Sequence, residues 1–175
     1  MQIIDNFLPK NTHTRIKELV LDNALYFPYY FHNTVAYNSP IESFDVKQLM
    51  FAHGLKNDEG IVSNYYERLV LPILDELNVN ENNLIRAKVN LNVNQNEQIK
   101  SNWHTDIDNV EKYTTAIYYI NTNNGYTELN NSQKIESIEN RILIFDGNIK
   151  HRGITQTNSK GRVTINLNYK NNEVI

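Results

Sequence analysis

The chain of 175 residues contains no cysteine. This absence excludes disulfide bonds, thiolate zinc sites, iron–sulfur clusters and cysteine nucleophiles. Any bound metal ion must therefore be held by histidine, carboxylate or neutral oxygen ligands. The chain has only five histidines to offer as imidazole ligands.

Long apolar runs and excess positive charge are also missing. No stretch of about 18 apolar residues is present, so the sequence predicts no membrane-spanning helix. The first residues, MQIIDN, lack the basic region and apolar run of a secretory signal. With 17 basic and 20 acidic residues, the chain lacks the positive excess typical of nucleic-acid-binding proteins, which argues against such a partner. We expect a cytoplasmic protein.

Glycine and proline are scarce, with six and four residues, and no linker, repeat or low-complexity tract divides the chain. The length fits one domain over residues 1–175 with a sizeable core. Within it, the sequence predicts a helical flank over residues 1–83 and a strand-rich core over residues 84–175.

Helical spacing of apolar residues predicts helices over residues 12–22, 61–77 and 45–52. Asn11 or Thr12 could be the N-cap of the first helix. Asn64 and Glu67 have the spacing of a capping box. Pro72 should kink or split the second helix, because it lacks the backbone N–H.

From residue 85 onward, apolar and polar residues alternate, which predicts strands over residues 85–93, 113–120, 126–129, 134–138, 141–145, 149–154 and 162–169. Asn124-Gly125 is typical of a hairpin turn, and Asp146-Gly147 indicates a second turn. Short strands of this kind favour a β-sandwich or barrel. If the apolar face packs on the helices, the polar face lines an interior that can hold a ligand.

His104, Asp106 and His151 form the candidate metal site. His104 and Asp106 are two residues apart, so in an extended segment they point the same way, and His151 comes from another strand. Two imidazoles and one carboxylate can occupy one face of an octahedral ferrous ion. The same ligands could bind zinc with an activated water. The remaining histidines are expected to be surface or packing residues: His13, His32 and His53.

Arg162 follows the second histidine and shares a strand face with Thr164. This face should point into the polar interior, beside the metal. A buried arginine needs an anionic partner, and its fork fits a carboxylate. If that partner is an anionic co-substrate, the arginine favours iron over zinc as the metal. The alternative partner is a strand carboxylate such as Glu128, in an internal salt bridge. Lys160 and Arg152 are expected to be solvated charges at the rim.

The ordered motifs resemble those of iron(II)- and 2-oxoglutarate-dependent dioxygenases, in particular the prolyl 4-hydroxylase-like branch with its short phage and bacterial members. They are HTD at 104–106, AIYYIN at 116–121, RILIFD at 141–146, His151 and RVTIN at 162–166. The resemblance covers residues 85–169. It implies a double-stranded β-helix (a cupin-like jelly roll) with N-terminal helices, Fe(II) as cofactor, and 2-oxoglutarate and O2 as co-substrates. A phage-encoded member would act in the host cell cytoplasm.

The resemblance makes three residues the iron ligands: His104, Asp106 and His151. It makes Arg162 the clamp on the distal carboxylate of 2-oxoglutarate, with Thr164 as a hydroxyl helper. Tyr119 corresponds to a tyrosine that reaches the same carboxylate, although a core aromatic is the alternative. Asn90 or Asn92 could contact the keto-acid end, where many relatives carry tyrosine.

The activity that the resemblance implies is hydroxylation of a peptidyl or free amino-acid side chain, with release of succinate and CO2. Asp106 occupies the carboxylate position, which favours hydroxylation over halogenation. Trp103 and the aromatic residues within 25–37 could form a substrate wall or pack internally. Two other functions stay open: a non-catalytic, metal-stabilised jelly-roll binding module, and a zinc hydrolase with Asp108 or Glu128 as general base.

Overall fold

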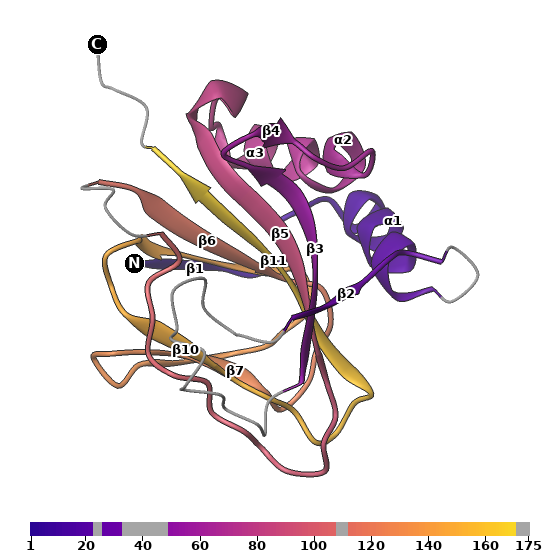
Figure 1. Ribbon diagram of the computed structural model, residues 1–175, viewed down its shortest axis with the longest axis vertical. Helices are drawn as coiled ribbons and strands as arrows, with labels where there is room; N and C mark the ends of the chain where they lie inside the picture. Colours follow the sequence, from indigo (N-terminus) through magenta and orange to yellow (C-terminus); the bar gives the residue numbers. More distant parts are fainter. Residues whose placement is uncertain (23–25, 33–48, 108–111, 171–175) are drawn as a thin grey trace.

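The computed structural model describes residues 1–22, 26–32, 49–107 and 112–170. In these ranges two antiparallel sheets of unequal size face each other, and the α-helices cover the outer face of the larger sheet (Figure 1). The chain is therefore mainly β with helices toward its N-terminus, a double-stranded β-helix as predicted.

The larger sheet has the strand order β1 (Gln2–Ile4), β9 (Arg141–Asp146), β6 (Thr114–Tyr119), β11 (Gly161–Tyr169), β5 (Leu84–Val93), β3 (Met50–Asn57) and β2 (Tyr30–His32), with β4 (Gly60–Ile61) paired to β3. The smaller sheet has the order β10 (His151–Ile154), β7 (Tyr126–Leu129) and β8 (Lys134–Glu136). The helices are α1 (Lys10–Leu21), α2 (Tyr66–Leu69) and α3 (Leu71–Leu77), followed by a 3-10 turn, η3 (Glu81–Asn83). Among the described residues, no helix is both long enough and apolar enough to cross a membrane.

The main core lies between the larger sheet and the helices. Successive side chains of a strand point to opposite faces. In β11, Val163, Ile165 and Leu167 are accordingly buried in the core that contains the helix residues. The intervening Arg162 and Thr164 face the opposite way and line a cavity. The predicted division of this strand into an apolar and a polar face is confirmed.

A second, smaller core fills the space between the two sheets. Its buried members are Ile117, Tyr119, Leu129, Ile135, Leu143 and Phe145. Because β6 contributes to both cores, all six of its residues are buried. Its sequence, TTAIYY, therefore does not alternate between apolar and polar residues as β11 does.

The two N-caps predicted from sequence are wrong. Helix α1 starts two residues earlier than expected, with Pro9 at its N-cap and no side-chain cap. Asn11 and Thr12 lie inside the first turn, where the Asn11 side chain accepts the Thr12 backbone N–H. The capping box also fails, because α2 begins after Tyr65, without a side-chain cap. The Tyr65 backbone N–H instead donates to Ser63 Oγ.

The split at Pro72 is confirmed. The predicted helix is divided into α2 and α3 at Val70, and Pro72 lies in the first turn of α3. A proline is tolerated there because its missing N–H has no partner within the helix in any case.

The first 83 residues also supply strands that the sequence analysis missed. The helix expected over residues 45–52 is wrong where the structure describes it, because Met50–Asn57 form β3 and pair with β5; residues 45–48 lie outside the described residues. Gln2–Ile4 pair with β9 at the edge of the sheet. All three residues of β1 are exposed, so they carry no apolar alternation that could reveal a strand.

The Asn124-Gly125 hairpin is also wrong. The strand before it, β6, pairs with β9 and β11, whereas the strand after it, β7, pairs with β8 and β10. The turn therefore carries the chain from the larger sheet to the smaller one. The Asp146-Gly147 turn is confirmed after β9. A Cβ at Gly147 would lie 2.1 Å from the Tyr113 ring, so the turn requires glycine.

Replacing Ile165 by alanine should lower the free energy of unfolding by about 2–5 kcal/mol, because the side chain is fully buried and its removal leaves a cavity. Urea unfolding measures this value. The control is Ile61→Ala, where the side chain is 56% exposed and a change within about 0.5 kcal/mol is expected. Equal effects of the two substitutions would contradict the placement of the core.

Candidate metal centre

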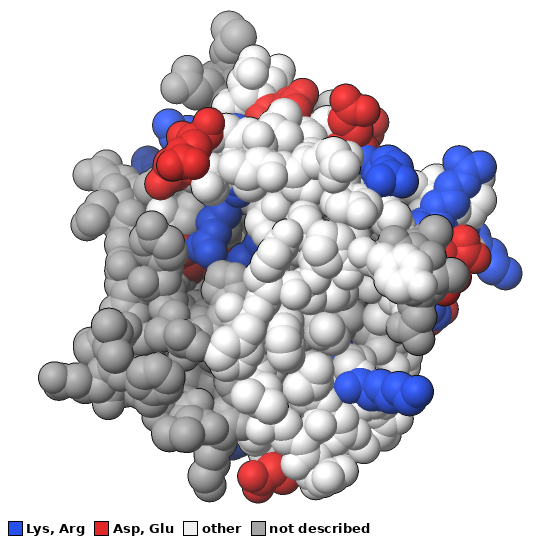
Figure 2. All heavy atoms as spheres, turned by 45° about the vertical axis from the view of Figure 1, so that its right-hand side comes forward, with Lys and Arg blue, Asp and Glu red and all other residues white. Residues whose placement is uncertain are grey.

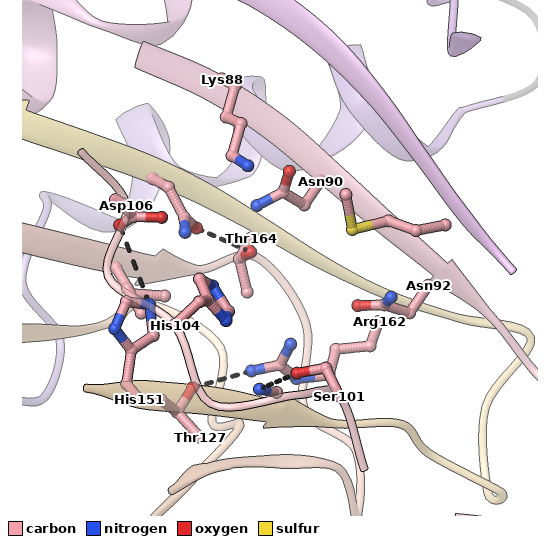
Figure 3. Close-up of a pocket in the computed structure, with 14 residues that line it drawn as sticks. Lys88, Asn90, Asn92, Ser101, His104, Asp106, Thr127, His151, Arg162 and Thr164 are labelled. Atoms are coloured by element: carbon pink, nitrogen blue, oxygen red, sulfur yellow. Dashed lines mark hydrogen bonds and ion pairs between the residues drawn. The ribbon is translucent and has the colours of Figure 1, made fainter. Parts of the chain in front are cut away.

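The structure brings His104, Asp106 and His151 together at one end of a cavity between the sheets (Figure 3). One possible ligand atom from each residue lies within 4.8 Å of the others. Two backbone hydrogen bonds hold the two segments side by side. The N–H of His104 donates to the carbonyl of His151 at 3.0 Å, and the N–H of His151 donates to that of His104 at 2.9 Å.

Both imidazole rings are turned so that Nδ1 faces a backbone carbonyl. His104 Nδ1 lies 3.0 Å from the carbonyl oxygen of Asn102, and His151 Nδ1 lies 3.5 Å from that of Ile149. A carbonyl accepts but cannot donate, so Nδ1 carries the proton in each ring. The lone pair then resides on Nε2, as in histidines that bind metals through Nε2.

Asp106 is fixed by a residue that the sequence analysis missed. Asn168 Nδ2 donates to Asp106 Oδ2 at 3.1 Å and also to Thr115 Oγ1 at 3.0 Å. Its position in β11 was a usable signal, because Asn168 shares a strand face with Arg162 and Thr164. The amide orients the carboxylate and leaves it ionised.

The protonation states of the buried pair suit a cation. Burial lowers the pKa of His151 to about 4, although the nearby Asp106 favours the imidazolium. Burial alone would raise the pKa of Asp106, but attraction by His151, Lys88 and His104, together with the Asn168 hydrogen bond, lowers it to about 2. A neutral imidazole and an ionised carboxylate are the forms that bind metals. His151 Nε2 and Asp106 Oδ2 are 3.8 Å apart, too far for a hydrogen bond. The donor set therefore fits a divalent cation.

Arg162 lies buried at the other side of the cavity without an acidic partner among the described residues. Its Nε donates to Ser137 Oγ at 2.7 Å, and its Nη2 donates to Thr127 Oγ1 at 3.0 Å. The alternative of a salt bridge to Glu128 is wrong, because that carboxylate pairs with Arg152 at 2.7 Å. Burial lowers the pKa of Arg162 from its usual value. Neutral hydroxyls do not balance a buried charge, so the guanidinium still requires an anion.

Tyr119 contacts this arginine from the adjacent strand. Its hydroxyl donates to the same Thr127 oxygen at 2.8 Å, and the guanidinium carbon of Arg162 lies 5.6 Å from the centre of its ring. Tyr119 is fully buried within the core between the sheets, as the alternative of a core aromatic expects. Its contact with a co-substrate carboxylate stays a prediction. Ser137 and Thr127 were missed, because no motif marks them.

Gly125 makes room for the arginine. A Cβ at this position would lie 2.8 Å from Arg162 Cδ and 2.8 Å from the carbonyl oxygen of Ile154. The Asn124-Gly125 pair, which suggested a hairpin, therefore lies where the chain crosses from the larger sheet to the smaller one. The glycine is needed there because the backbone passes close to the buried side chain of Arg162.

Asn90, Asn92 and Thr164 line the wall between the metal ligands and Arg162. Thr164 Oγ1 donates to Asn166 Oδ1 at 3.1 Å. Asn90 Oδ1 and Asn92 Nδ2 are buried and have no hydrogen-bond partner among the described residues. Buried polar atoms of this kind are rare unless a ligand or water satisfies them.

Lys88 is a further cation in the cavity wall that the sequence analysis did not single out for a role. It lies on the same face of β5 as Asn90 and Asn92, and its ammonium extends into the cavity (Figure 3). Burial lowers its pKa to about 8; Arg86 adds to the shift and Asp106 opposes it.

At the rim of the cavity, the environment of Arg152 differs from the one expected. This residue is not a solvated charge, because it pairs with Glu128 and its guanidinium lies 4.2 Å from the centre of the Trp103 ring. Trp103 is 39% exposed and thus packs only partly. Lys160 is exposed, as expected.

Outside the cavity, the other candidates are packing residues where the structure describes them. His13 Nδ1 bonds Tyr118 at 2.6 Å, and His53 bonds the Pro28 carbonyl and Ser63 Oγ. In the aromatic segment, Phe27 packs against Tyr29, His53 and Tyr65, whereas Tyr26, Tyr30 and Phe31 are exposed. Tyr37 and Asp108 lie outside the described residues.

The metal-free protein should lose stability below neutral pH because of His151. Its pKa is about 4 in the fold and about 6.5 in the unfolded chain. The unfolded chain therefore binds the proton first, so the stability from the neutral ring is complete above pH 6.5 and is lost as the pH falls toward 4. Over this window the wild type should lose about 3 kcal/mol more unfolding free energy than His151→Asn. Urea unfolding with a chelator measures both profiles; parallel profiles would contradict the shift.

Comparison with known proteins gives the fold of this site. No protein-family model matches the sequence, and no curated protein matches it as a relative. Solved structures do match. A prolyl hydroxylase from Trichoplax adhaerens, in complex with a hypoxia-inducible factor oxygen degradation domain peptide, has a TM-score of 0.65 at 16% identity, covering 97% of this chain and 82% of that one.

Two further structures agree. A 2OG-Fe(II) oxygenase family oxidoreductase from Burkholderia pseudomallei has a TM-score of 0.66 at 10% identity over 96% of this chain and 84% of its own. The non-heme alpha-ketoglutarate-dependent epimerase SnoN from nogalamycin biosynthesis has a TM-score of 0.62 at 11% identity over 97% and 76%. At these identities the likeness concerns the fold. The chain therefore has the fold of the 2-oxoglutarate- and Fe(II)-dependent oxygenases and carries a His-x-Asp…His triad within it.

Proposed function

We propose that the protein is an Fe(II)- and 2-oxoglutarate-dependent oxygenase. One observation carries the proposal: a His104–Asp106–His151 triad and a buried Arg162 without an acidic partner line the same cavity. The triad suits a divalent cation, and the arginine requires an anion. A dicarboxylate that chelates the metal at one end and contacts Arg162 at the other would satisfy both.

The proposed reaction balances as a hydroxylation. The C–H substrate, 2-oxoglutarate and O2 give the alcohol, succinate and CO2. One oxygen atom of O2 enters the alcohol and the other enters succinate, while the two electrons beyond those of the C–H bond come from oxidative decarboxylation. The metal, when bound, supplies the oxygen-activating chemistry.

The residues of the chain bind and orient. Arg162 fixes the distal carboxylate bidentately, and Thr127 and Ser137 hold its guanidinium in place. Asn92 offers its unpaired N–H to the region between the metal and Arg162. Asn168 keeps Asp106 aligned and ionised. Together these contacts would hold the co-substrate in one orientation relative to the metal.

We propose a peptidyl or free amino-acid side chain as the substrate. Support comes from the structural likeness to a prolyl hydroxylase that was solved with a peptide. The charge distribution agrees, since on the face in Figure 2 lysine, arginine and acidic side chains are interspersed rather than joined in a basic stripe. A nucleic-acid substrate would favour such a stripe.

The zinc-hydrolase alternative requires a general base beside the metal-bound water. Of its two candidates, Glu128 is held by Arg152 at 2.7 Å, which favours a structural ion pair over proton transfer. A non-catalytic binding module would keep the metal without turnover.

Anaerobic addition of Fe(II) and 2-oxoglutarate should produce a weak visible charge-transfer band, and admission of O2 should release succinate. His104→Ala should abolish the band, because the ion loses one of its three protein ligands. Absorbance and succinate assays measure both effects. Hydrolytic activity with zinc and no band would contradict the proposal, as would metal-dependent stabilisation without any succinate.

Arg162→Ala should weaken 2-oxoglutarate binding about thirtyfold or more, since loss of one partner from a buried charge pair costs about 2–5 kcal/mol. Metal binding should be retained. Titration of 2-oxoglutarate into the Mn(II)-loaded, oxygen-free protein measures the affinity. The control is Arg141→Ala, which removes a guanidinium paired with Asp5 outside the cavity. Unchanged affinity in Arg162→Ala would contradict the role of this arginine.

A further inference from the structure

Lys88 enters the cavity from the side remote from Arg162. In the sheet, Lys88 is paired with Asn166, whereas Arg162 is paired with Asn92. Lys88 and Asn92 are four positions apart in β5, which places the two pairs about 13 Å apart along the strand. Figure 3 shows the side chains of Lys88 and Arg162 reaching into the cavity from opposite sides.

The ammonium of Lys88 has no hydrogen bond or ion pair with any residue that the structure describes. Asp106 attracts it from a distance, as the pKa shifts of both groups indicate, but this carboxylate is directed to the metal position and to Asn168. A partly buried ammonium without a partner is costly to maintain.

Among the described residues, charge balance leaves Lys88 uncompensated even in the loaded site. The cation and Arg162 together match the negative charges of Asp106 and a bound 2-oxoglutarate dianion, and the two imidazoles are neutral. Among the described residues that line the cavity, Asp106 is the only carboxylate. The remaining positive charge therefore belongs to Lys88, on the side left for the substrate.

Resting on the proposed function, we infer that the substrate of this site carries a carboxylate and that Lys88 binds it. The neighbouring Asn90, with its unpaired side-chain oxygen, would accept a hydrogen bond from an N–H donor near that carboxylate. The α-carboxylate and amino group of a free amino acid, or an acidic side chain and backbone N–H of a peptide, present this combination. Lys88 thereby determines both which substrates bind and which C–H bond faces the metal.

The test measures binding without catalysis. Mn(II) replaces Fe(II), 2-oxoglutarate is saturating and oxygen is absent, so that proton NMR line broadening by Mn(II) reports ligands near the metal. The probes are matched pairs that differ in one charge: L-amino acids with their α-carboxamides, and end-blocked peptides containing Asp or Glu with their Asn or Gln counterparts. The first pairs report a free amino acid and the second an acidic peptide.

Carboxylate probes of at least one series should bind the wild type more tightly than their amides. Lys88→Met, which removes the charge and keeps the length, should weaken that binding about tenfold to a hundredfold, the range for a hydrogen bond to a charged group. Lys88→Arg should retain part of the preference. Lys160→Met, which removes an exposed lysine outside the cavity, should leave it unchanged. If Lys88→Met does not fold, Lys88→Gln serves the same comparison.

Three outcomes would overturn the inference: no charge preference among the probes, a preference that survives in Lys88→Met, or no binding of any probe to the wild type. A loss of 2-oxoglutarate affinity in Lys88→Met as large as in Arg162→Ala would also overturn it, because Lys88 would then serve the co-substrate. Failure of the wild type to bind 2-oxoglutarate at all would instead reject the proposed function. The two failures are thus distinguishable.

Discussion

The register of β11 between β5 and β6 determines the rest of this structure. One face of the strand presents Val163, Ile165 and Leu167 to the helices, and the other presents polar side chains to the cavity. A shift of one residue would move Arg162 into the apolar core and the apolar residues into the cavity. The hydrophobic core thus fixes the site. The residues that stabilise the fold and those that line the cavity alternate along a single strand.

The cavity concentrates charge that the fold alone does not neutralise. Arg162 contacts hydroxyls and an aromatic ring, Lys88 contacts no acidic group in the described chain, and Asp106 faces the neutral imidazole of His151. Such arrangements cost stability in the absence of ligands. They are typical of functional sites, where perturbed pKa values and unpaired polar atoms gather. Binding of a cation and of anions in the cavity would therefore raise the free energy of unfolding.

The sequence was informative where alternation was strong and one face carried distinctive residues. The strands from β5 to β11, the two faces of β11 and the split at Pro72 followed from periodicity and backbone chemistry. By contrast, β1 is exposed and three residues long, and β3 is defined by its pairing with β5, so local patterns could not reveal them. The N-caps failed because Asn11 and Asn64 have capping propensity but lie at other positions in the observed turns.

At the site, the sequence indicated residues with recognisable chemistry and spacing. The HTD triplet, His151 and Arg162 belong to this class. Asn168, Ser137 and Thr127 carry common polar side chains whose importance comes only from the residues they contact in space. Lys88 had the right strand phase for the interior, but a lysine in an alternating strand is ordinarily solvated. Its lack of a partner is visible only in three dimensions.

At Gly125 the distance between the two sheets and the position of the Arg162 side chain depend on each other. The turn backbone, the Ile154 carbonyl and the aliphatic stem of Arg162 share a space with no room for a methyl group. A displacement of the smaller sheet relative to the larger one would therefore change the contacts of Arg162. It would also move His151, the first residue of β10, relative to Asp106, which Asn168 of β11 holds. The distance between the two sheets thus sets the positions of the guanidinium and of the His151 imidazole together, and a side chain at position 125 would disturb both.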